Sequence, residues 1–212
     1  MRIVLAIAAI AVGGPAAATP DVSRLVLQPA QVAKGYVMLA QKGGKLVKGQ
    51  VTLNLCGTGY TSERFRTTRL QVNYANRAAP VAISNEVVTY RTDGAAQAMR
   101  EVTRRVATCP HKPIDSGAVG APKLTFKLTR ISDPRLLKGY VAVRVVVTGI
   151  FQGKPVTQTT YAVYQQRGSV LSGIYSFGGS SAAQRKLILH AAEASAQNLR
   201  RGGSGALSAP TA

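Results

Sequence analysis

The sequence predicts an α+β protein with one antiparallel sheet of about five to seven strands, backed by two main helices. Three observations predict this class. Segments rich in alternating or β-branched apolar residues outnumber helical segments along the chain. Short glycine-containing turns separate the last three of these segments, which is typical of an antiparallel meander. Two further segments carry apolar residues at helical spacing.

The first half of the chain is predicted to contain a strand pair. Residues 65–74 alternate between apolar and polar side chains, which indicates a half-buried strand. Residues 81–90 are predicted to pair with it through a turn at 76–80. The side chains expected on the apolar face of the first strand are Leu70, Val72 and Tyr74.

A helix is predicted over residues 94–108, with Asp93 as its N-cap. Upstream of the strand pair, residues 29–33 favour one helical turn, and residues 36–41 and 46–55 favour short extended pieces.

The second half is predicted to be a strand, a meander and a closing helix. The four predicted strands are residues 123–131, 139–151, 156–166 and 170–177. The closing helix is expected from Ser181 to about residue 200, because Ser181 and Gln184 have the spacing of a capping box. Residues 202–212 are mostly small and include a proline, which predicts a flexible tail after a single domain at 19–201.

Residues 1–18 have the layout of a secretory signal peptide. One arginine is followed by an apolar run at 3–12, a Gly-Gly-Pro break, and small residues suited to cleavage at 16–18. The run is shorter than the roughly 20 residues that a membrane span needs. No cysteine follows it, so a lipid anchor is not expected. We therefore expect a secreted or extracytoplasmic protein without a transmembrane segment in its mature form.

The two cysteines, Cys56 and Cys109, are expected to form one disulfide. Export places them in an oxidising compartment, where paired cysteines persist. The enclosed loop is long, and chain entropy predicts a stabilisation of about 4 kcal/mol. The alternative is a reactive or metal-binding thiol. It has little support, because only His111 lies near either cysteine in the sequence.

Several short motifs together resemble the extracellular sensor domain of the Ser/Thr kinase PknH and its free-standing secreted or lipid-anchored relatives. They lie between residues 56 and 200 and include Cys56-Gly57, Tyr60-Thr61-Ser62-Glu63, Ser84-Asn85-Glu86-Val87-Val88, Cys109-Pro110, Gly139-Tyr140-Val141 and Tyr164-Gln165. The resemblance implies a helix-backed antiparallel sheet and a ligand cleft, without assigning binding residues. This chain departs from the pattern in having one possible disulfide and no cysteine for lipid attachment.

Catalytic candidates are few. The only carboxylate pair worth testing for glycoside hydrolysis is Glu63 and Glu86, and the only histidine bases are His111 and His190. No nucleophile elbow or phosphate-binding loop occurs in the sequence. We expect Glu86 to be a structural ion-pair partner of Arg66, Arg69 or Arg144, and we expect no cofactor and no metal site.

The charge is strongly basic, with 27 Lys and Arg against 8 Asp and Glu and a formal net charge of +19. Such a balance attracts polyanions. Outside the cell, anionic cell-wall polymers, lipid headgroups or a small anionic ligand fit better than nucleic acid, with Arg66, Arg69 and Arg144 as candidate ligand-binding residues. The leading hypothesis is a non-enzymatic, sensor-like binding protein of the cell envelope. The alternatives are an exported hydrolase, an envelope scaffold or partner protein, and a basic surface without a binding role.

Overall fold

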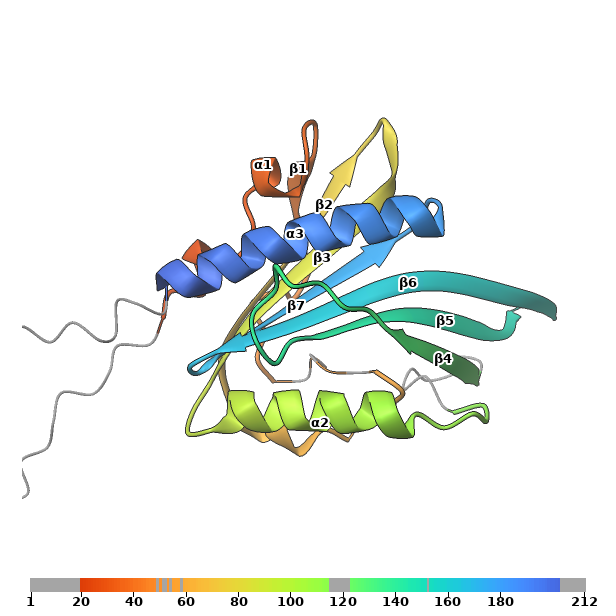
Figure 1. Ribbon diagram of the computed structural model, residues 1–212, viewed down its shortest axis with the longest axis horizontal. Coiled ribbons are helices and arrows are strands. Elements are labelled where there is room, and N and C mark those ends of the chain that lie inside the picture. The colour runs from red at the N-terminus through yellow and green to blue at the C-terminus, as the bar shows by residue number, and fades with distance from the viewer. Residues whose placement is uncertain are drawn as a thin grey trace, which may run out of the picture.

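A seven-stranded antiparallel sheet forms the centre of the protein (Figure 1). The computed structural model describes residues 20–48, 50, 53, 55–57, 59–114, 123–151 and 153–202. The predicted signal peptide and the predicted tail beyond residue 202 lie outside these residues. In chain order the elements are η1 (Val22–Arg24), α1 (Pro29–Val32), β1 (Val37–Ala40), η2 (Thr61–Phe65), β2 (Arg66–Asn76), β3 (Ala79–Tyr90), α2 (Gly94–Thr108), β4 (Leu124–Arg130), β5 (Val141–Phe151), β6 (Lys154–Arg167), β7 (Val170–Phe177) and α3 (Ser181–Gly202), where η marks a 3₁₀ helix.

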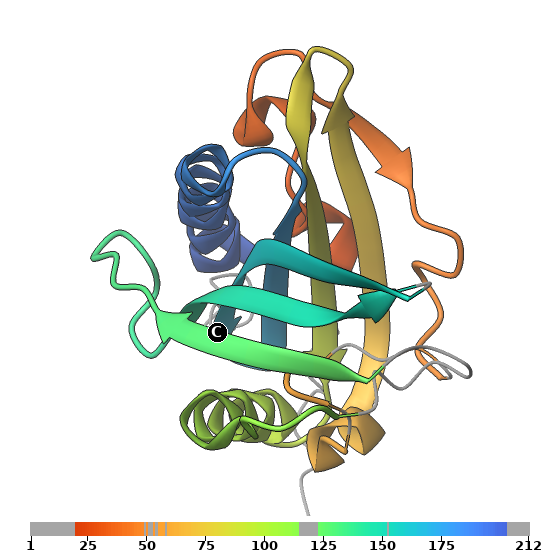
Figure 2. The same ribbon diagram turned by 90° about the vertical axis from the view of Figure 1, so that its right-hand side faces the viewer.

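The strands lie in the order β1-β2-β3-β7-β6-β5-β4, and all neighbours are antiparallel. The meander β5-β6-β7 joins the β2–β3 hairpin through β7, because β3 pairs with β7 rather than with β4. The predicted fold class and the predicted meander are confirmed. β1 and β4 are left as the two edge strands, and Figure 2 shows β1 at the outer edge beyond β2.

The two long helices cover opposite faces of the sheet (Figure 1). Successive side chains of a strand point to opposite faces. Thus Val87 of β3 belongs to the core beneath α3, and Val88 belongs to the core beneath α2. The predicted alternation in β2 is also confirmed, with Leu70, Val72 and Tyr74 on the α3 face.

Helix α3 packs on the sheet through buried polar side chains as well as apolar ones. Gln184 accepts a hydrogen bond from the Ser176 hydroxyl at 2.9 Å and donates to the Thr159 carbonyl at 3.0 Å. The predicted capping box is therefore wrong, because the Gln184 side chain turns toward the sheet. The hydroxyl of Ser180 caps the helix instead, accepting from the backbone N–H of Ala183.

Helix α2 has the predicted bounds, and Asp93 is its N-cap residue, although its side chain makes no capping hydrogen bond. Cys109 directly follows the helix and is bonded to Cys56, with an S–S distance of 2.02 Å. The predicted disulfide is confirmed, and it ties the segment before η2 to the end of α2. The short helix η2 is not foreseen by the sequence patterns, since its five residues are too few to show a period.

Candidate ligand pocket beside the β1 edge

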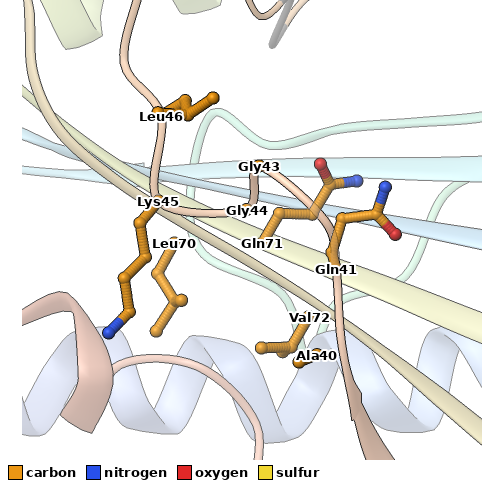
Figure 3. Close-up of a pocket in the computed structure, with 9 residues that line it drawn as sticks. All are labelled: Ala40, Gln41, Gly43, Gly44, Lys45, Leu46, Leu70, Gln71 and Val72. Carbon is orange, nitrogen blue, oxygen red and sulfur yellow. The ribbon is translucent and has the colours of Figure 1, made fainter.

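A cavity of ≈ 460 Å³ lies beside β2, at the turn that follows β1 (Figure 3). Its walls come from the end of β1, the following turn and the middle of β2. The lining residues are Ala40, Gln41, Gly43, Gly44, Lys45, Leu46, Leu70, Gln71 and Val72. The lining is mostly aliphatic and backbone, and Lys45 is its charged residue. Figure 3 shows the Lys45 side chain extending beside Leu70.

The turn at 41–46, which we call the pocket loop, is held against β2 by backbone hydrogen bonds. The Gln71 N–H donates to the Gly44 carbonyl at 2.9 Å, and the Gly44 N–H donates to the Gln41 carbonyl at 2.9 Å. A Cβ atom at residue 44 would lie 2.4 Å from the Gln71 carbonyl oxygen. Only glycine permits this close approach, so residue 44 sets the shape of the pocket wall.

Arg69 fixes the pocket loop from the other face of β2. Its Nη1 donates to the Gly43 and Gly44 carbonyls at 3.1 and 3.2 Å, while its Nε donates to Glu86. Nη2 donates to the Gln71 side chain. The side chains of Arg69 and Glu86 are each 2% exposed. All three guanidinium nitrogens therefore have acceptors within the fold. Arg69 is thus a structural residue that holds the pocket loop in place, and its guanidinium is occupied by these contacts.

The three arginines expected to bind ligand do not form one site. Arg66 pairs with Glu63 at 2.8 Å and donates to the Gln50 carbonyl at 2.7 Å. Its side chain therefore connects η2 to the segment at residue 50 and has a structural role. The side chain of Arg69 lies on the α2 face of β2, whereas Arg144 lies on the α3 face of β5. Four strand spacings separate β2 from β5, about 19 Å at the usual spacing. A strand pattern shows which face a residue takes but not which strands are neighbours. The sequence therefore could not show that Arg69 and Arg144 lie far apart.

The rim of the pocket is basic. Four lysines with exposed side chains flank β1 and the pocket loop: Lys34, Lys42, Lys45 and Lys48. None of them forms an ion pair with another residue that the structure describes. The sequence contains no acidic residue between Asp21 and Glu63. The potential around this pocket is therefore positive, which favours anionic groups.

The residues considered for hydrolysis are not arranged as a catalytic group. Glu63 and Glu86 are each paired with an arginine, and His111 and His190 are exposed. Burial raises the pKa of Tyr90, and nearby Glu63 and Glu86 raise it further. A tyrosine nucleophile or base needs the opposite shift. Within the described ranges, no group of three or more His, Cys, Asp and Glu residues could hold a metal ion.

Glu101 of α2 is a structural residue that sequence reasoning missed. Its carboxylate accepts hydrogen bonds from the hydroxyls of Thr61 at 2.5 Å and Ser62 at 2.6 Å, and from both backbone N–H groups. Burial raises the pKa of Glu101, but hydrogen bonds from Ser62, Thr61 and Gln97 outweigh burial and bring it to about 2. The side chain therefore joins α2 to η2. An isolated acid in a helical pattern gives no signal of this role.

Comparison with protein families finds no match, and comparison with curated proteins finds none either. Among solved structures, the chain is similar to the extracellular domain of PknH from Mycobacterium tuberculosis, at 10% identity and a TM-score of 0.48. The match covers 82% of this chain and 94% of that chain. It is a structural resemblance, and no ligand, residue role or location is transferred from it. No helix among the described residues is long and apolar enough to cross a membrane.

Proposed function

We propose that this protein is an extracytoplasmic, non-enzymatic, sensor-like binding domain of the cell envelope that holds an anionic partner at the pocket beside β1. The observation that carries the proposal is an aliphatic cavity with Lys45 in its wall and further lysines on its rim. Apolar pockets with a few placed polar groups are the usual form of a ligand site. The aliphatic wall would contact the body of the partner, and Lys45 would contact its negative group.

The disulfide supports the location. Cys56 and Cys109 are bonded, and such bonds persist in oxidising compartments and are rare where thiols are kept reduced. The signal peptide predicted over residues 1–18 agrees with this location. The anionic partner fits the chemistry of cell-wall polymers, lipid headgroups or small anions that occur there.

Binding to poly(glycerol phosphate), measured by titration calorimetry at about 0.05 M and about 0.5 M salt, tests the proposal. We expect binding that weakens steeply with salt, because exposed charges are screened. The variant Lys42→Ala/Lys45→Ala should bind at least about fivefold more weakly, since it removes two cations from the pocket rim.

The matched control is Lys123→Ala/Lys127→Ala, which removes the same charge from exposed positions at the opposite edge of the sheet. This control should bind nearly as the unchanged protein does. Equal weakening in both variants would mean that only net charge matters. Binding that does not change with salt would also contradict the proposal.

A further inference from the structure

Strand β1 exposes apolar side chains along its whole length. Val37, Met38 and Leu39 are 56%, 38% and 46% exposed, and the fourth residue of the strand, Ala40, is exposed too. Leu46, in the adjacent pocket loop, is 55% exposed. β1 pairs with β2 on one side and with no described strand on the other. An apolar edge of this kind is a template for pairing with another chain.

The other edge of the same sheet is built differently. Strand β4 carries Lys127 and Arg130 within its length, and most of its other side chains are partly buried. Ile114 forms a bridge with Leu124 at the start of β4, which covers part of that edge. Lysine on the strand and coverage of its edge are the usual ways in which proteins prevent edge pairing. β1 has neither, and its lysines lie before and after the strand rather than on it.

We propose that β1 is a docking edge for an extended segment of an acidic polypeptide, which adds to the sheet as a further strand. The proposal rests on the proposed function and names the partner of the same site. The backbone of the segment pairs with the outer edge of Val37–Ala40, and its apolar side chains contact Val37, Met38 and Leu39. This is recognition by strand addition, in which main-chain hydrogen bonds give affinity and side-chain pockets give selectivity.

The position of the pocket supports this mode. Ala40 is both the last residue of β1 and the first residue in the pocket wall. A segment that follows β1 therefore continues directly to the cavity, where one of its side chains can enter. An aspartate or glutamate there meets Lys45, and acidic residues at either end of the segment meet Lys34 and Lys42.

Charge and backbone chemistry decide between the three possible occupants. A second copy of this chain would bring another strongly basic surface, with a formal net charge of +19, against the same lysines. A membrane would attract the lysines, but the outer N–H and C=O groups of β1 would lose water without gaining partners in hydrocarbon. An acidic extended polypeptide satisfies both the lysines and the strand edge.

The test uses a synthetic peptide with acidic residues at both ends, alternating valine and threonine in the centre, and one tryptophan. The protein contains no tryptophan, so peptide fluorescence reports binding directly. A second peptide has the same side chains but carries N-methyl groups on alternate backbone amides. We expect it to bind at least about tenfold more weakly, because strand hydrogen bonds are lost at constant charge. Backbone amides of Val37–Ala40 should also become protected from hydrogen exchange on binding of the first peptide.

The protein variants are Lys42→Glu/Lys45→Glu and the control Lys123→Glu/Lys127→Glu, which have equal net charge. The first should weaken peptide binding about tenfold or more, and the control far less. Equal binding of the two peptides overturns strand addition but leaves anion binding at Lys45 standing. If the unchanged protein binds neither the peptide nor poly(glycerol phosphate), the proposed function is overturned as well. Binding to anionic vesicles without peptide binding, or a dimer that the peptide does not dissociate, also overturns the proposal.

Discussion

At the scale of single residues, the buried guanidinium of Arg69 connects the sheet to the pocket. It pairs with Glu86 on β3 and donates to carbonyl groups of the pocket loop. An ion pair this deeply buried contributes little net stability compared with apolar residues of the same volume. Its value lies in geometry, because one planar group reaches β3 and the pocket loop at the same time.

A double-mutant cycle separates these two roles. Arg69→Met should lower the free energy of unfolding by about 3–5 kcal/mol, because it removes the guanidinium that pairs with the buried Glu86 carboxylate. Arg69→Met/Glu86→Leu should recover most of this loss, since no buried charge remains. Both variants lack the hydrogen bonds from Arg69 to the pocket loop. We therefore expect faster amide exchange of residues 41–46 in both. Urea unfolding and hydrogen exchange measure the two effects, and unchanged exchange in the pocket loop would contradict this role of Arg69.

At the scale of elements, Glu101 joins α2 to η2 through one carboxylate. The pKa of Glu101 is about 2 in the folded protein, below its ordinary value of 4.5, because hydrogen bonds to Ser62, Thr61 and Gln97 outweigh burial. A depressed pKa means that the ionised form stabilises the fold. This contribution is present above about pH 4.5 and is lost as the pH falls toward 2.

Glu101→Gln should therefore lower the free energy of unfolding near pH 7 by about 1–3 kcal/mol. The difference from the unchanged protein should shrink between pH 4.5 and 2, because protonation removes the same charge from Glu101. Denaturant unfolding across this pH range measures the effect. Asp93→Asn is a suitable control, since Asp93 lies on the same helix's N-cap and its pair with Arg100 is largely exposed. A difference that stays constant with pH would contradict a role for the charge of Glu101 in stability.

At the scale of the whole molecule, the bond between Cys56 and Cys109 spans 53 positions of the chain. The enclosed segment includes η2, β2, β3 and α2, so the bond restricts a large part of the unfolded chain. It also fixes the end of α2 to the segment that precedes η2. Without the bond, the only covalent connection between these two parts is the long chain segment that separates them in the sequence.

Cys56→Ser/Cys109→Ser should lower the free energy of unfolding by about 2–4 kcal/mol while leaving the native circular dichroism spectrum unchanged. The unchanged protein in reductant should unfold at the same denaturant concentration as the variant. This comparison separates loss of the bond from any effect of the serine side chains. A variant as stable as the oxidised protein would contradict the role assigned to the bond.

Local patterns in the sequence determined most of the secondary structure. The alternation of Leu70, Val72 and Tyr74 fixed which face of β2 is buried, and the helical spacing of residues 94–108 fixed α2. These features depend on side chains within a few positions of one another, so a single sequence contains them. The pairing of the two cysteines was also accessible, because the chain has only two.

Only the tertiary structure decided which distant segments meet. The pairing of β3 with β7 places β2, which carries Arg69, far from β5, which carries Arg144, although both arginines were candidate ligand-binding residues. It also leaves β1 as an apolar edge, next to the pocket loop that Arg69 contacts and that carries Lys45. In this arrangement α2 and α3 pack on opposite faces of the sheet. This packing sums contacts over the whole chain, and no local sequence pattern contains it.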